Sequence, residues 1–230
     1  MQHLTTSSSD ADFHNSLIRP NIGELIGSFL FAFLGCFAGQ HPHIKEFTYP
    51  IFTALSLYIS RALVLHATPA YFNPAVTIVQ CVRREIPIAL AISFIVVQLF
   101  AFFAAITIFR CLTDQSVVND NLILYDLVED MGIRRVSRLQ AFLIEMALSI
   151  VFYSSFRLKK NKEAIIALSW GLIQYISFPL YGFSSNISLL FASSIISLIF
   201  SPTTTPSVIL LYLNVFNALV SVVLTVSIDV

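Results

Sequence analysis

Tyr71-Phe72-Asn73-Pro74-Ala75-Val76-Thr77 is the stretch that decides how this chain folds. Asn-Pro is a turn-forming pair, yet an apolar segment precedes it and Ala-Val-Thr-Ile-Val follows without a polar loop. Asn is among the preferred N-cap residues, and Pro is favoured at the first helical position. The stretch therefore predicts a helix that begins at Pro74 and is capped by Asn73. The alternative is an ordinary turn at a membrane surface.

The composition indicates the environment of this helix. Of the 230 residues, 57% are hydrophobic and only 11% are charged, whereas soluble domains have about 25% charged residues. The formal net charge is zero, so no nucleic-acid partner is expected. Cys36, Cys81 and Cys111 lack CxxC or Cys/His spacing. We therefore expect them to be packing residues, and we expect neither a metal site nor a cofactor.

Apolar stretches long enough to cross a bilayer recur along the chain. About 20 apolar residues span a bilayer as a helix. The sequence predicts an all-α membrane protein with six transmembrane helices, at about Ile22–Gly39, Tyr49–Leu65, Ile86–Phe109, Leu139–Phe156, Ala164–Tyr181 and Ser207–Ile228. Two shorter apolar stretches, Pro74–Val82 and Ile187–Phe200, are predicted to be re-entrant half-helices.

The polar segments of the chain predict its orientation in the membrane. Residues 1–20 are rich in Ser, Thr and Asp, which predicts a disordered cytoplasmic tail rather than a cleavable signal peptide. Arg83, Arg84 and the basic link Arg157–Lys162 fall on the same side as the N-terminus if there are six spans. The positive-inside rule then predicts that both termini are cytoplasmic. Whether the membrane is the plasma membrane or an intracellular one stays open. Arg61, in the second span, is expected to extend toward the cytoplasmic face, and a position lining a pore is the less favoured alternative.

The two halves of the membrane domain, residues 21–230, resemble each other. Residues 21–110 and 139–230 each begin with a span that carries an early glutamate, Glu24 or Glu145, and each contains a short apolar segment led by Asn. The second copy follows three spans, so it is inserted upside down. In such inverted repeats the functional site lies where the broken helices meet. Ionisable groups inside spans are usually functional or paired, although a helix-end position is the alternative for both glutamates.

The capping residues of the half-helices, Asn73 and Asn186, are candidate site residues. A capping Asn uses its carbonyl oxygen on the backbone, which leaves its amide N–H groups to point beside the helix. Helix starts also carry partial positive charge. Two such starts that face each other donate hydrogen bonds to a neutral polar molecule and disfavour cations and protons. Asn186-Ile187-Ser188 is also an N-glycosylation sequon, which is the alternative for Asn186.

These motifs resemble those of the aquaporin, or major intrinsic protein, family. The resemblance rests on Asn73-Pro74-Ala75-Val76-Thr77, Glu24-x-x-Gly27, Gln98, Glu145 and Pro179-x-x-Gly182-x-x-x-Asn186. It implies a right-handed six-helix bundle in which Glu24 and Glu145 hold the re-entrant loops. It also implies a homotetramer in membrane lipids, with one pore per subunit. The lining residues implied at the centre of that pore are Asn73, Pro74, Ala75, Asn186, Ile187 and Ser188.

The second half departs from the family pattern. The family has Asn-Pro-Ala-Arg where this chain has Asn186-Ile187-Ser188-Leu189, so the proline and the arginine of the outer mouth are both lost. This arrangement is similar to that of divergent family members. His66 is a candidate lining residue of the cytoplasmic approach. By the same alignment, the outer constriction would consist of Thr53, Gln174, Phe183 and Leu189, without a fixed charge.

The resemblance implies a passive channel for water and small neutral solutes such as glycerol or hydrogen peroxide. The altered second motif suggests an alternative of another class, a non-conducting structural or adhesive membrane protein that has kept the fold. An ion-coupled transporter is disfavoured because few ionisable residues fall within the spans. The sequence holds no recognisable nucleophile–base pair, so an enzyme is not expected.

Overall fold

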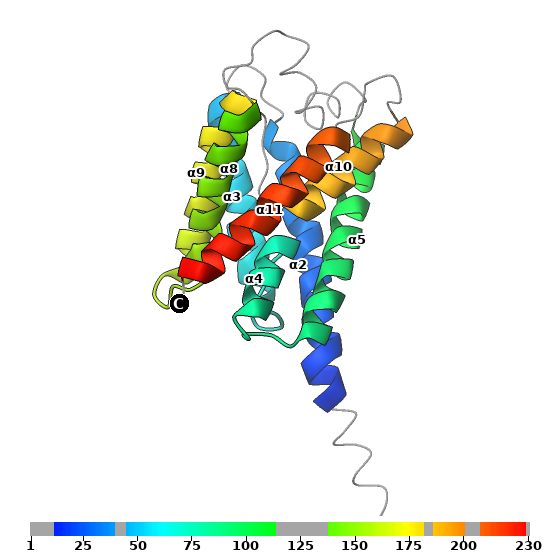
Figure 1. Cartoon of the computed structure of the whole chain (residues 1–230). Helices are drawn as coiled ribbons and strands as arrows, with labels where there is room; N and C mark the ends of the chain where they lie inside the picture. The colour runs from blue at the N-terminus through cyan, green and yellow to red at the C-terminus, as the bar shows by residue number, and fades with distance from the viewer. Residues whose placement is uncertain (1–11, 40–44, 114–137, 182–185, 201–207, 229–230) are drawn as a thin grey trace, which may run out of the picture.

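The computed structural model describes residues 12–39, 45–113, 138–181, 186–200 and 208–228, in which there are eight α-helices and no β-strand. The helices lie side by side, inclined to one another, in a single bundle (Figure 1). The short π-helical segment His14–Ile18 leads directly into the first of them. The α-helices are α2 (Arg19–Cys36), α3 (Lys45–Val64), α4 (Pro74–Val82), α5 (Ile88–Leu112), α8 (Arg138–Ser155), α9 (Lys162–Tyr181), α10 (Ile187–Phe200) and α11 (Val208–Ile228).

The predicted pattern of six spans and two half-helices is confirmed. Both half-helices, α4 and α10, have the bounds that the sequence predicts. By length and composition, three helical stretches of the described residues are long and apolar enough to cross a membrane: His14–Cys36, Phe47–Val64 and Ile88–Leu112. The predicted extent of the tail is wrong at its end, because the helical path already begins before α2, at His14–Ile18. Residues 1–11 of that tail lie outside the described residues.

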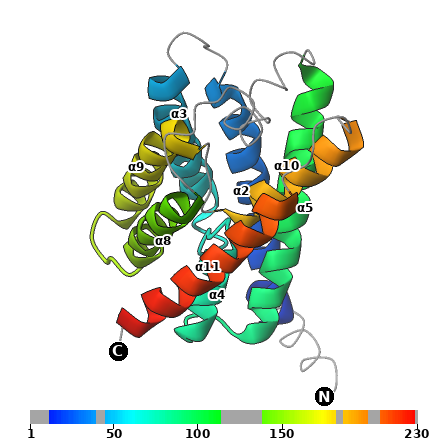
Figure 2. The same ribbon diagram turned by 45° about the horizontal axis from the view of Figure 1, so that its top comes forward.

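The two half-helices occupy opposite ends of the bundle. In Figures 1 and 2, α4 lies toward the end at which α2 begins, and α10 lies toward the other end. The end of α11 points toward the same end of the bundle as the start of α2 (Figure 2). The repeats also interlock, because α3 packs against α9, α10 against α5, and α11 against α4. The inner ends of both half-helices therefore lie in the interior, between the two repeats.

Apolar side chains cover the outside of the bundle as well as its core. Ile88 and Phe100 of α5 and Leu168 of α9 are 70%, 64% and 69% exposed. A soluble monomer rarely exposes large contiguous apolar patches, whereas a bilayer solvates them. The distribution agrees with an integral membrane protein.

Small residues allow the helices of the bundle to approach closely. A Cβ atom added at Gly171 of α9 would lie 2.9 Å from the Cβ of Ala54 on α3. A Cβ atom added at Gly27 of α2 would lie 2.1 Å from Cζ of Phe72, a distance that no side chain tolerates. Phe72 itself is fully buried. Gly27 therefore provides the space in which the loop before α4 is seated.

Gly27→Ala is expected to destabilise the protein by about 1–3 kcal/mol, the usual cost of overpacking a core, because the ring of Phe72 must move. The measurement is thermal unfolding of the detergent-solubilised protein. Gly35→Ala, in the same helix, is the matched control, since no described atom lies within 4 Å of its added Cβ. That control is expected to be neutral or to stabilise by up to about 1 kcal/mol through helix propensity. Equal effects of the two substitutions would show that Gly27 does not provide the space for Phe72.

Candidate functional site

The first half-helix begins as the sequence predicts. Asn73 has extended backbone angles (φ −153°, ψ 121°), and its Oδ1 accepts a hydrogen bond from the backbone N–H of Ala75 at 3.0 Å. Pro74 occupies the first helical turn. The backbone carbonyl of Asn73 accepts from both the N–H and the hydroxyl of Thr77, at 2.9 and 3.0 Å. The helix start is thus fixed from both sides in a fully buried position.

The second half-helix is capped without its proline. Oδ1 of Asn186 accepts from the backbone N–H of Ser188 at 2.9 Å and from that of Leu189 at 3.4 Å. The sequence predicts that the amide N–H groups of a capping Asn are free and point into the space beside the helix. Instead, Nδ2 donates to the backbone carbonyl of Phe72 at 2.9 Å, so one of its two N–H groups is used. Since Phe72 directly precedes Asn73, this bond joins the starts of the two half-helices. Asn186 is only 1% exposed, which argues against use of the sequon.

The loop before α4 is held by Glu24 of α2, whose carboxylate is completely buried. Oε1 accepts from the N–H of Phe72 at 2.6 Å and from Nε2 of Gln98 at 2.7 Å. Oε2 accepts from the hydroxyl of Thr68 at 2.8 Å and from the N–H of Tyr71 at 3.4 Å. A buried carboxylate is tolerated only when such donors compensate it. The structural role expected for Glu24 is therefore met by its contacts.

The donors that converge on Glu24 hold a loop with a strained backbone. Ala70 and Phe72 have φ values of 56° and 53°, in the left-handed region that residues with side chains rarely adopt. Such conformations persist only where the surroundings impose them. Gln98 extends the network by donating to the hydroxyl of Thr77 at 2.9 Å, which ties the loop, α4 and α5 together.

The counterpart in the second repeat is described only in part. Glu145 of α8 is buried, with 5% of its surface exposed. The loop that it is expected to hold includes residues 182–185, which lie outside the described residues. Phe183, one of the four residues predicted for the outer constriction, falls in the same gap. The role of Glu145 and the place of Phe183 therefore stay predictions.

The other predicted site residues differ in how deeply the structure buries them. Thr53 is buried on α3, and its hydroxyl donates back to the carbonyl of Tyr49 at 2.9 Å. Gln174 of α9 is fully buried, and Leu189 of α10 is half-buried against the core. His66 is exposed just beyond the end of α3, where its backbone carbonyl accepts from Nη2 of Arg19 at 2.7 Å.

The expectation for Arg61 is wrong. Its side chain does not extend to the surface but is completely buried between α3, α9 and the loop before α4. Nε donates to Oε2 of Glu163 at 2.5 Å, and Nη1 donates to the carbonyl of Ala70. The guanidinium carbon also lies 5.0 Å from the ring centre of Phe156, the residue directly after α8. A charge at this depth needs such partners, and the sequence could not reveal them because Glu163 is 102 residues away.

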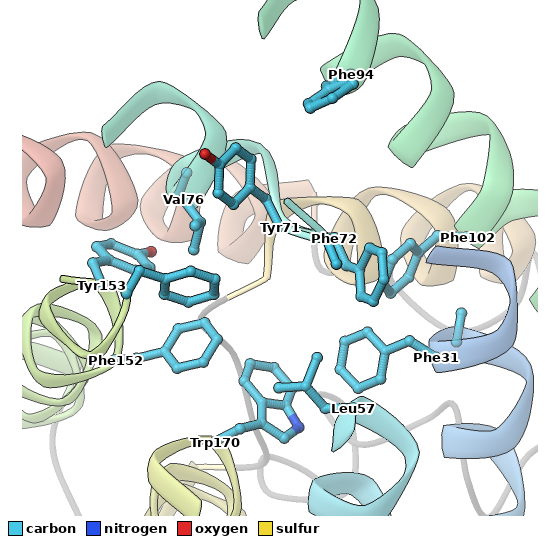
Figure 3. Packing of buried hydrophobic residues seen from close by; sticks show 14 of the residues in the cluster. Phe31, Leu57, Tyr71, Phe72, Val76, Phe94, Phe102, Phe152, Tyr153 and Trp170 are labelled. Atoms are coloured by element: carbon cyan, nitrogen blue, oxygen red, sulfur yellow. The ribbon is translucent and has the colours of Figure 1, made fainter. Parts of the chain in front are cut away.

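Aromatic side chains fill the centre of the bundle beside the two helix starts (Figure 3). Trp170 of α9 packs against Phe31 of α2, with ring centres 5.5 Å apart, and against Phe152 of α8, at 5.3 Å. Leu57 of α3 lies in the same cluster. The indole N–H of Trp170 is buried without a hydrogen-bond partner among the described residues. Sequence reasoning did not single out these residues, because apolar and aromatic residues are common in every span.

A membrane bundle in which two half-helices enter from opposite ends and meet start to start has the architecture of a channel rather than that of an enzyme. The sequence model described as "Major intrinsic protein" matches residues 12–208 of this chain, which therefore belongs to that family. Members of the family are channels, so the expectation that the chain is not an enzyme is confirmed.

A solved structure supports the fold independently. The chain resembles the X-ray structure of the aquaglyceroporin from Plasmodium falciparum with a TM-score of 0.70 and 18% sequence identity, over 91% of this chain and 94% of that chain. At this identity the likeness establishes the fold. A comparison with curated proteins found no match.

Proposed function

We propose that the protein is a passive channel for water and for small neutral solutes such as glycerol or hydrogen peroxide. The observation that carries the proposal is the hydrogen bond from Nδ2 of Asn186 to the carbonyl of Phe72, which brings two capped helix starts together in the bundle interior. The partial positive ends of both helices then face one region. Such a region favours neutral hydrogen-bonding solutes and disfavours cations.

In this proposal the residues around the two helix starts line the middle of the path. Thr53, Gln174, Phe183 and Leu189 form its outer mouth, and His66 lies at its inner approach. Glu24 and Glu145 hold the two loops in place. The residues of the middle section are Asn73, Pro74, Ala75, Asn186, Ile187 and Ser188.

The proposal includes an assembly and an orientation. A homotetramer in membrane lipids, with one path per subunit and the channel domain at residues 21–230, follows the pattern of the family. Both termini are placed in the cytoplasm, with residues 1–11 as a tail. In support, the exposed basic residues Arg84, Lys159 and Lys160 follow α4 and α8, on the loops at the end of the bundle where α2 begins.

Stopped-flow light scattering on proteoliposomes tests the proposal. Vesicles that contain the protein are expected to shrink faster than empty vesicles under an osmotic gradient, and a panel of water, glycerol and urea identifies the solutes. Protease protection of the exposed Arg157–Asn161 link measures insertion and orientation in the same vesicles. Correctly inserted protein without any gain in permeability would refute the proposal.

A second candidate, a non-conducting membrane protein with the same fold, is favoured by the aromatic cluster. The ring of Trp170 contacts those of Phe31 and Phe152 at the centre of the bundle. If these side chains close the path, the protein inserts normally and adds no permeability. The vesicle assay separates the two candidates directly.

Leu189→Arg is expected to reduce glycerol flux more than water flux, by about tenfold against about twofold. A long charged side chain narrows the mouth, which adds a larger barrier for glycerol than for the smaller water molecule. The flux of each solute falls in proportion to the exponential of that added barrier. Leu189→Met, which changes neither charge nor size appreciably, is the matched control. Rates of water and glycerol entry in the same vesicles provide the measurement. Equal loss of both fluxes would show that position 189 does not lie at the mouth.

A further inference from the structure

One helix face brings Arg61 into line with the proposed path. Thr53, Leu57 and Arg61 are spaced four residues apart on α3, so they lie on the same face, and each of them is buried. On the antiparallel helix α9, Gln174 and Trp170 form the facing stripe, which is buried as well. The pairs Thr53–Gln174, Leu57–Trp170 and Arg61–Glu163 therefore follow one another from the proposed outer mouth inward.

The guanidinium of Arg61 lies on the inner side of the point where the half-helices meet. Its Nη1 donates to the carbonyl of Ala70, and Phe72, two residues later, accepts from Asn186 at that meeting point. Two residues of chain span at most about 7 Å. Thr53 lies eight residues away on α3, about 12 Å along the helix in the other direction. Arg61 and the outer mouth are thus on opposite sides of the centre.

The contacts of Arg61 come from the interior of the bundle and not from its lipid face. Glu163 of α9 accepts from Nε, the carbonyl of Ala70 in the loop accepts from Nη1, and the ring centre of Phe156, directly after α8, lies 5.0 Å from the guanidinium carbon. Nη2 is buried and has no hydrogen-bond partner among the described residues. Glu163 is 27% exposed, so the ion pair opens to solvent on one side. A buried N–H donor without a described acceptor therefore lies beside an ion pair that is partly exposed on its Glu163 side.

We propose that Arg61 is the charge barrier and hydrogen-bond donor of the inner half of the path, which excludes small cations and protons in a chain whose outer mouth carries Leu189. The inference rests on the proposed function. Glu163 compensates the guanidinium at Nε, so the positive charge acts on the Nη2 side, where it repels cations in a low-dielectric space and does not repel neutral solutes. The free Nη2–H donates to a passing neutral solute, and Glu163 keeps the guanidinium oriented.

The test measures water flux and ion leak in the same proteoliposomes. Water flux is followed by light scattering, and proton and methylammonium entry by an internal pH dye under a valinomycin-clamped potential. The variants are Arg61→Met, which keeps length but removes charge, and Arg61→Lys, which keeps charge but cannot make all of the contacts. Arg84→Met is the matched control, because Arg84 is exposed and lies outside the hydrogen-bond network described above. Glu163→Gln leaves Arg61 in place and removes its counter-charge.

For Arg61→Met we expect water flux to persist and the ratio of cation leak to water flux to rise about tenfold or more, as loss of a buried charge predicts. Arg61→Lys and Arg84→Met are expected to retain the ratio of the unchanged protein. Glu163→Gln is expected to lower cation leak and raise the permeability to nitrate. If the ion pair is purely structural, Arg61→Lys and Arg61→Met both lose water flux, and neither variant gains cation leak.

The outcomes separate the inference from the proposed function. If the unchanged protein conducts water and Arg61→Met conducts it without added cation leak, the inference is wrong. Loss of water flux in Arg61→Met would also overturn it, because Arg61 then builds the path and does not filter it. If Arg61→Met does not fold, Glu163→Gln decides, and unchanged ion selectivity in that variant refutes the barrier. Absence of water flux in the unchanged protein would refute the proposed function and this inference with it.

Discussion

Glu24→Gln is expected to destabilise the protein by about 3 kcal/mol or more and to abolish water flux. The substitution replaces one carboxylate oxygen by an NH₂ group, which then faces an existing donor. At Oε1 the donors are the N–H of Phe72 and Nε2 of Gln98. At Oε2 they are the hydroxyl of Thr68 and the N–H of Tyr71. Buried donors without acceptors cost about 1–3 kcal/mol each. Without the hydrogen bonds from the loop to Glu24, the left-handed backbone at Phe72 is no longer held.

Thermal unfolding of the solubilised protein and stopped-flow water flux measure the two effects. The matched control is Glu85→Gln, the same chemical change at an exposed carboxylate between α4 and α5. It is expected to leave both quantities within error of the unchanged protein, since exposed substitutions usually stay within about 0.5 kcal/mol. If Glu24→Gln is as stable as Glu85→Gln, the carboxylate does not hold the loop. If it is unstable but conducts normally, the loop geometry is not required for the path.

The half-helices were predictable because their signals are local. Asn73 and Pro74 specify a helix start through chemistry within three residues, and the structure begins α4 at Pro74. The same reasoning held for α10 without its proline, because the cap of Asn186 depends on the side-chain oxygen and not on the following residue. Gln98 and Glu24, both named by the family resemblance, do meet in the structure.

The contacts between the repeats could not be predicted from such signals. Asn186 and Phe72 are 114 residues apart in the sequence, and Arg61 and Glu163 are 102 residues apart. No local pattern identifies such a partner. Arg61 is expected to extend toward the cytoplasmic face because arginine generally prefers the membrane interface, whereas the helix packing provides it with a half-buried carboxylate and a buried carbonyl. The position of a charged residue inside a span does indicate that it has a partner.

The aromatic cluster leads to the second prediction of large effect. Trp170→Val is expected to raise water flux about tenfold and to raise glycerol flux from a low level, because it removes the largest side chain at the centre of the bundle. A tenfold change corresponds to about 1.4 kcal/mol of barrier. The ring of Trp170 contacts those of Phe31 and Phe152, and its indole N–H has no partner in the described part of the chain. Shortening this one side chain therefore opens space between α2, α8 and α9.

Two further variants identify what Trp170 does. Leu172→Val, two residues away on the outward face of α9 and 51% exposed, is the control and is expected to change neither flux. Trp170→Phe keeps a ring and removes the N–H, so a rise as large as that of Trp170→Val would assign the barrier to the donor and not to volume. If the unchanged protein does not conduct but Trp170→Val does, the aromatic cluster closes the path in the unchanged protein. If folded, inserted Trp170→Val matches the unchanged protein in both fluxes, solutes do not pass this cluster, and the path lies elsewhere in the bundle.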